Sequence, residues 1–96
     1  MRRVIRSAQS ENDLIAIGRY IALDSEEAAT RLLERIDQRI QLLPEFPFIG
    51  ERQLQFGPSI RRIVEGNYLI FYDVLPDAIY VLRVYHAARK LDDLFD

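Results

Sequence analysis

Residues 68–86, YLIFYDVLPDAIYVLRVYH, decide the fold of this chain. β-Branched and aromatic side chains dominate two runs, Tyr68–Leu75 and Ala78–His86, and a Pro-Asp pair between them suits a tight turn. A third run, Ser59–Glu65, comes before them and is followed by a Gly-Asn pair. The three runs predict consecutive antiparallel strands.

The N-terminal part of the chain has a helical period instead. A short strand is expected at Arg3–Arg6. Ser10 with Asp13 three residues later resembles a capping box, and apolar residues then recur at i, i+3 and i+7. This pattern predicts a first helix that ends near Leu23.

A second helix is predicted directly after the first. Asp24 with Glu27 forms another capping signature, and Pro44 stops the apolar stripe that follows. Two amphipathic helices with so short a connection must fold back as an antiparallel hairpin. The segment Pro44–Pro58 is interpreted as irregular chain over the core, with room for a short strand.

The expected architecture is therefore α+β, in the order β-α-α-β-β-β. A small antiparallel sheet carries the helical hairpin on one face. With 96 residues the chain forms a single domain, 1–96, around one core.

Composition excludes several classes of function. The chain has no cysteine and one histidine, so a disulfide framework, a thiolate nucleophile and a metal site are not expected, and neither is a cofactor. No apolar run approaches the roughly 20 residues of a membrane span, and no signal-peptide core follows the N-terminus. We expect a cytoplasmic protein without a membrane partner. A net charge of −2 argues against direct, specific binding of nucleic acid.

The last two strands have apolar residues on both faces. By alternation, Tyr68, Ile70, Tyr72 and Val74 face one way, and Leu69, Phe71 and Leu75 the other. In the final strand the two sets are Ile79, Val81, Arg83 and Tyr85, and Tyr80, Leu82, Val84 and His86. A helical hairpin covers only one face. The other must be covered by Pro44–Pro58, by the tail or by another chain, and we expect a partially open groove there that binds a partner.

Three side chains are candidates for chemistry. His86 has the side chain suited to acid–base catalysis near neutral pH, and its structural alternative is a strand-end histidine bonded to the backbone or a carboxylate. Alternation places Arg83 on the face opposite His86. Arg61 is either a phosphate or carboxylate contact or an ordinary surface arginine.

A longer pattern spans nearly the whole chain and ends in the run His86-Ala87-Ala88-Arg89. Its other residues are Ala8, Asp13-Leu14, Ile17, Tyr20-Ile21, Ala29, Leu32, Ile36, Leu43, Pro47, Gly50, Ile60-Arg61, residues 68–72 and residues 81–85. In order and spacing this pattern resembles the RelE/ParE superfamily of type II toxin–antitoxin toxins. The closing run is more similar to ParE-like members than to RelE-like ones, although Lys90 stands where members often have Asp.

The resemblance implies a toxin that inhibits DNA gyrase and is neutralised by a cognate antitoxin, ParD-like or other, in a hetero-oligomer. Such a toxin is not an enzyme. The alternative is a RelE-like, ribosome-dependent mRNA endonuclease, with His86 as acid or base and Arg61 and Arg83 stabilising charge. A single lysine and the acidic balance favour the ParE-like interpretation. A degenerate toxin that survives as a binding module is a third interpretation.

The resemblance also suggests binding residues. The antitoxin's C-terminal segment is expected to fold onto the helical hairpin and the sheet. The residues expected to contact it are Arg61, Arg83, Arg89, Tyr72 and Phe71. The tail residues expected to face the target are Leu91, Leu94 and Phe95.

Overall fold

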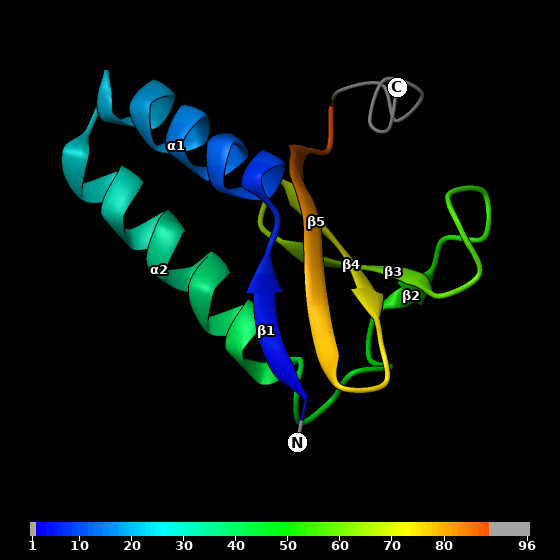
Figure 1. The fold of residues 1–96 in the computed structure, drawn as a ribbon. Coiled ribbons are helices and arrows are strands. Elements are labelled where there is room, and N and C mark those ends of the chain that lie inside the picture. The colour runs from blue at the N-terminus through cyan, green and yellow to red at the C-terminus, as the bar shows by residue number, and fades with distance from the viewer. Residues whose placement is uncertain (1, 89–96) are drawn as a thin grey trace.

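A computed structural model describes residues 2–88 of the chain. Its two helices lie side by side along one side of a five-stranded sheet (Figure 1). The elements in chain order are β1 (Arg3–Arg6), α1 (Ala8–Ala22), α2 (Glu26–Leu42), β2 (Glu51–Arg52), β3 (Ile60–Glu65), β4 (Tyr68–Val74) and β5 (Ala78–His86). The predicted α+β class and element order are confirmed, and β2 is the short strand for which the irregular segment had room.

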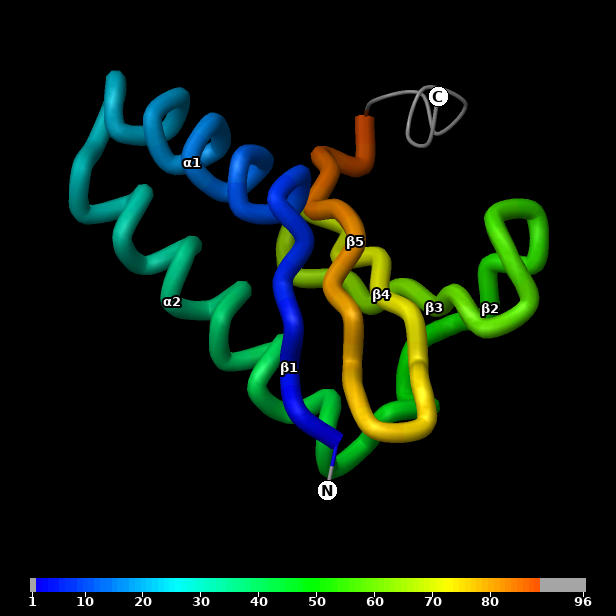
Figure 2. Tube along the Cα trace, in the orientation of Figure 1, coloured from blue at the N-terminus to red at the C-terminus, as the bar shows by residue number. Residues whose placement is uncertain are grey.

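The strand order in the sheet is β1-β5-β4-β3-β2. Strands β3 to β5 pair antiparallel, as predicted, and β2 also pairs antiparallel with β3. The sheet as a whole is mixed, because β1 runs parallel to β5, with Arg3 opposite Ala78 and Arg6 opposite Val81 (Figure 2). Parallel partners need a long connection, and here everything between β1 and β5 serves as that connection. The expected all-antiparallel sheet is therefore wrong at this one edge.

Both helix starts differ from the predicted caps. Ser7 caps α1, where its Oγ accepts a hydrogen bond from the Ser10 amide at 3.0 Å, so the helix begins before Ser10. Ser25 caps α2 in the same way, with its Oγ 3.1 Å from the Ala28 amide. In each case a serine one or more residues from the predicted position supplies the acceptor that the first turn needs.

The main core lies between the helices and one face of the sheet. The buried residues of this core are Leu32, Ile36, Ile40, Leu43, Ile63, Tyr68, Ile70, Tyr72, Ile79, Val81 and Val84. The apolar stripe of α2 thus packs on alternate residues of β4, as the periodicity predicts.

A bulge changes the alternation of β5. Phe71 pairs with Arg83 while the next residue, Tyr72, pairs with Val81, so Leu82 lies outside the register. Val84 consequently joins Val81 in the main core, and Tyr85 turns to the opposite face. The predicted faces of β5 are therefore wrong on one side of the bulge.

Part of the second face of the sheet is covered by the chain itself. Leu69, Phe71 and Tyr85 are buried there beneath Phe56 and Ile60. Phe56 belongs to the irregular segment, which is one of the coverings considered for this face. The expectation of a partially open face is therefore wrong at Leu69, Phe71 and Tyr85, whereas Val64, which pairs with Leu69, is 51% exposed.

Exposed apolar side chains lie mainly on the helical hairpin and in the loop that follows it, and one, Val64, lies on the second face of the sheet. They are Ile15, Tyr20, Leu23, Leu42, Phe46, Phe48, Ile49, Leu54 and Val64. Within residues 2–88, neither helix has the length and apolar character needed to cross a membrane.

Candidate functional site

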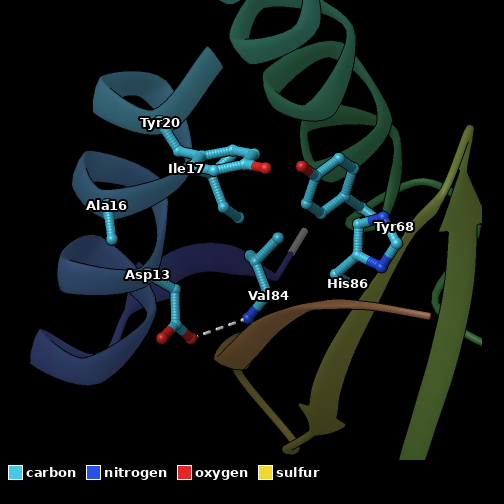
Figure 3. A pocket seen from close by; sticks show the side chains of 7 residues that line it. All are labelled: Asp13, Ala16, Ile17, Tyr20, Tyr68, Val84 and His86. Atoms are coloured by element: carbon cyan, nitrogen blue, oxygen red, sulfur yellow. Dashed lines mark hydrogen bonds between the residues drawn. The ribbon is translucent and has the colours of Figure 1, made fainter. Parts of the chain in front are cut away.

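A groove of about 530 Å³ lies between α1 and the adjoining ends of β4 and β5. Figure 3 shows the side chains that line it: Asp13, Ala16, Ile17, Tyr20, Tyr68, Val84 and His86. The four helical residues lie at intervals of three and four, which places them on one face of α1. Val84 and His86 alternate onto the same face of β5, and Tyr68 is the register partner of His86.

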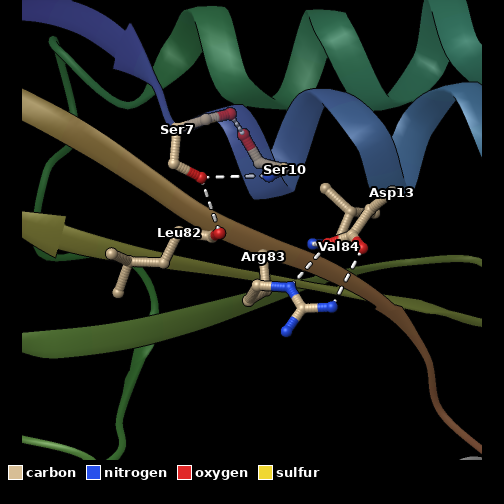
Figure 4. Close-up of polar contacts among 6 residues, drawn as sticks. All are labelled: Ser7, Ser10, Asp13, Leu82, Arg83 and Val84. Atoms are coloured by element: carbon tan, nitrogen blue, oxygen red, sulfur yellow. Dashed lines mark hydrogen bonds and ion pairs between the residues drawn. The ribbon is translucent and has the colours of Figure 1, made fainter. Parts of the chain in front are cut away.

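One end of the groove is fixed by an ion pair between α1 and β5. The Arg83 guanidinium donates to Asp13 from Nε at 2.8 Å and from Nη2 at 3.0 Å (Figure 4). The Val84 amide donates to the same carboxylate at 3.0 Å. The hydrogen bonds from Arg83 to Asp13 raise the pKa of Arg83, and this effect exceeds the opposite effect of partial burial. Both side chains are therefore occupied within the chain.

The other end of the groove is formed by Tyr20, Tyr68 and His86. The rings of Tyr68 and His86 meet edge to face, with centroids 5.2 Å apart. Burial, and to a lesser degree the neighbouring Tyr20, raises the pKa of the Tyr68 phenol, so its hydroxyl is protonated at neutral pH. In Figure 3 the two tyrosine hydroxyls point toward each other across the groove.

His86 also has a backbone contact at the end of β5. Its Nδ1 accepts a hydrogen bond from the Ala88 amide at 3.1 Å. A neutral imidazole that accepts at Nδ1 carries its proton on Nε2. This contact is the structural alternative considered for His86, and it leaves Nε2 as a donor.

The three candidate catalytic residues do not come together. In the sheet register Arg61 is opposite Tyr72, whereas His86 is opposite Tyr68. Four residues of extended strand separate these two positions by about 13 Å. Arg83 pairs with Phe71, and this places it on the face opposite His86, as alternation predicts.

Arg61 is engaged in holding the loop before β2. Its Nη1 donates to the carbonyl oxygens of Phe48, at 3.2 Å, and of Gly50, at 2.8 Å. The guanidinium also lies over the Phe48 ring, 5.3 Å from the centroid. These contacts describe a structural arginine.

Phe71 and Tyr72, both expected to contact the antitoxin, have no exposed surface. Phe71 lies in the second core, and the Tyr72 hydroxyl donates to the Pro47 carbonyl and accepts from the Gly50 amide, both at 2.9 Å. Neither side chain offers a surface to a partner. The other residues expected to bind, Arg89 for the antitoxin and Leu91, Leu94 and Phe95 for the target, lie outside the described residues.

Sequence reasoning named His86 but missed its neighbours in the groove. Tyr20 is 74% exposed, although it lies next to the apolar positions of α1. A side chain with a hydroxyl among apolar residues is the sequence signal that could have identified it. Among residues 2–88 no cluster of three or more metal-ligating side chains occurs.

Comparison with known proteins identifies the family of the chain. The profile of the family described as "ParE toxin of type II toxin-antitoxin system, parDE" matches residues 4–91. Toxin RelE2 of Caulobacter vibrioides is 32% identical over 89 residues, covering 93% of this chain and 99% of that protein. A solved structure of the chromosomal ParDE TA system from P. aeruginosa has the same fold, with a TM-score of 0.74 at 20% identity, over 90% of this chain and 96% of that one. The chain therefore belongs to the ParE toxin family of type II toxin–antitoxin systems.

Proposed function

We propose that this chain inhibits DNA gyrase in the cytoplasm and that a cognate antitoxin neutralises it by direct binding in a hetero-oligomer. Family membership provides the class of protein. The observation that carries the choice of target is the separation of Arg61, Arg83 and His86 in the fold. Cleavage of RNA through its 2′-hydroxyl needs an acid, a base and cations around one phosphate.

The partners of these three residues support the same choice. Arg83 is bound to Asp13, and Arg61 is bound to two loop carbonyls. Recruiting either guanidinium to a phosphate would first break contacts that hold the fold. The net charge of −2 is also unfavourable for a protein that must bind the ribosome and mRNA.

The antitoxin contact is proposed at the groove and on the exposed face of α1. Tyr20 lines the groove, and Ile15 and Leu23 add exposed apolar surface elsewhere on α1 and at its C-terminal end; a segment that folds on binding gains affinity by burying such surface. This proposal replaces the buried Phe71 and Tyr72 as contacts. Arg83 acts indirectly, because it positions the Asp13 wall of the groove.

Two assays on the purified chain separate the possible targets. In a plasmid supercoiling assay with DNA gyrase, we expect dose-dependent inhibition. In an in vitro translation reaction, we expect ribosome-bound mRNA to remain intact. Codon-specific cleavage of that mRNA with unaffected gyrase would overturn the proposal in favour of the endonuclease. The translation assay is included because the Caulobacter relative is named RelE2.

Expression in cells tests whether the chain is toxic at all. Induction without antitoxin is expected to arrest growth, and a chain that causes no arrest would instead be a binding module. His86→Gln keeps a side chain of similar size and is expected to arrest growth as the parent does. Loss of arrest by a folded His86→Gln protein would contradict the non-catalytic role proposed for His86.

A further inference from the structure

We propose that the groove recognises an apolar segment of the antitoxin that carries one carboxylate side chain, and that the carboxylate binds Tyr20, Tyr68 and His86. This inference rests on the proposed neutralisation by an antitoxin and names the chemistry of the contact. It specifies which chemical group of the antitoxin the groove binds, a point that the exposed apolar surface alone does not decide.

The middle of the groove selects for apolar side chains. Ala16 and Ile17 line it from α1, and Val84 lines it from β5. Water in contact with these side chains is released when an apolar group enters, so burial of the partner's apolar surface stabilises the complex. The volume of about 530 Å³ suits a few side chains of one segment.

The polar end of the groove offers three hydrogen-bond donors, two of which are tyrosine hydroxyls that can also accept. The hydroxyls of Tyr20 and Tyr68 and the Nε2 of His86 make no hydrogen bond to any other residue within 2–88. Tyr68 is only 9% exposed, so a partner that excludes water from its hydroxyl must supply an acceptor. A carboxylate has acceptor sites alone and can satisfy donors on two sides.

The charges of the groove point to the same group. Asp13 is the acidic residue of the lining, and its Oδ2 and Oδ1 already accept hydrogen bonds from Arg83 and the Val84 amide. A cationic side chain would therefore find no unpaired carboxylate here. The described lining contains no arginine or lysine, so a dianionic phosphate, such as the terminal phosphate of a nucleotide, would lack a counter-charge. A singly charged carboxylate in an apolar segment fits both conditions.

Titration of the full-length chain with small probes, followed by ¹H–¹⁵N NMR, tests this assignment. The probe is 4-phenylbutanoate, whose ring represents the apolar segment and whose carboxylate represents the acidic side chain. The comparison probes are 4-phenylbutanamide, which has the same shape without the charge, and phenyl phosphate. We expect shifts at the groove residues and about tenfold weaker binding of the amide, the ratio that a loss of one charge-assisted hydrogen bond produces.

Variants connect the preference to the named side chains. Tyr20→Phe alters an exposed side chain and should leave the fold intact, and Tyr68→Phe and His86→Gln alter the remaining donors. Each is expected to reduce the preference for the carboxylate over the amide. Tyr80→Phe, on β5 but outside the groove lining, is the matched control and should retain the preference.

Several outcomes would overturn the inference. They are equal binding of acid and amide, tightest binding of phenyl phosphate, shifts located away from the groove, and absence of binding at millimolar probe. A preference that survives in all three donor variants would also contradict it. None of these measurements uses an antitoxin or gyrase, so their failure is distinguishable from failure of the gyrase assay.

Discussion

Asp13 and Arg83, 70 residues apart in sequence, join the first helix to the last strand through two hydrogen bonds of 2.8 and 3.0 Å. The Val84 amide completes the contact by donating to the same carboxylate. The pair lies beside the β5 bulge, where strand register alone does not fix the backbone. It therefore determines the distance between α1 and β5, which are the two walls of the groove.

Asp13→Asn is expected to lower the free energy of unfolding by about 2–3 kcal/mol, because it leaves the Arg83 charge without its counter-ion. The two side chains are only 15% and 18% exposed, so water replaces the lost partner poorly. Urea denaturation at neutral pH measures the change.

The matched control is Asp37→Asn, which removes the acidic partner of Arg6 at a half-exposed position. Exposed ion pairs contribute about 0–1 kcal/mol, so this variant should unfold close to the parent. Equal loss in the two variants would show that Asp13 contributes nothing beyond an ordinary surface pair.

Tyr72 makes stability dependent on alkaline pH. Burial raises the pKa of its phenol above the ordinary 10.0, although the Gly50 amide and the positive charge of Arg61 act in the opposite direction. The folded chain therefore holds this proton more strongly than the unfolded chain. The contribution of the protonated Tyr72 to the free energy of unfolding is fully present below pH 10 and is lost as pH rises above it.

Tyr72→Phe is accordingly expected to lose about 1 kcal/mol at pH 7, because the Gly50 amide and Pro47 carbonyl lose a partner. Its free energy of unfolding should then decline less steeply than that of the parent between pH 9 and about 11. Denaturation series across this range, with Tyr80→Phe as the tyrosine control, measure both effects. An unchanged slope in Tyr72→Phe would assign the alkaline loss to other groups.

Gly50 is required by close packing beside the same hydroxyl. A Cβ at this position would lie 2.5 Å from the Tyr72 hydroxyl oxygen and 2.7 Å from the Arg62 carbonyl oxygen. The carbonyl belongs to the backbone of β3 and cannot move without disturbing the sheet. We expect Gly50→Ala to destabilise the chain by about 2–3 kcal/mol, within the range of overpacked sites.

Gly18→Ala is the matched control for Gly50→Ala. Its Cβ would meet the Leu33 Cδ1 at 3.0 Å, at the movable end of a side chain, and alanine favours the helix by about 1 kcal/mol. The two variants should therefore differ in thermal midpoint, with Gly50→Ala much lower. Similar midpoints would contradict the close packing described here.

The sequence predicts the elements of this fold well because their periodicity is local. β5 begins at Ala78 and ends at His86 as predicted, and β1 has its predicted bounds. The covering of the second face was open at the sequence level, because Phe56 reaches it through an irregular segment without periodicity. The bulge at Leu82 was also invisible, since a one-residue change of register leaves no mark in composition.

The candidate site was only partly predictable for a related reason. His86 stands out by its chemistry, but its neighbours in the groove come from α1 and β4, and only the packing of the hairpin brings them together. Arg61 and Arg83 were predicted to contact the antitoxin, but the structure gives each of them a partner within the chain. Arg61 binds the Phe48 and Gly50 carbonyls, and Arg83 binds Asp13. These partners are distant along the chain, so the sequence does not indicate the contacts.

The tail provides the most direct separation of toxicity from antitoxin binding. We expect replacement of Leu91, Leu94 and Phe95 together by alanine to abolish gyrase inhibition and growth arrest, because these residues are proposed to face the target. If their role is to contact the target, the midpoint of thermal unfolding should change little. Probe binding at the groove should also persist, since the side chains of the described lining, Asp13 to His86, are unchanged. A triple variant that still inhibits gyrase at the parental dose would place the target contact elsewhere, and the exposed loop residues Phe46, Phe48 and Ile49 would then be the next to replace.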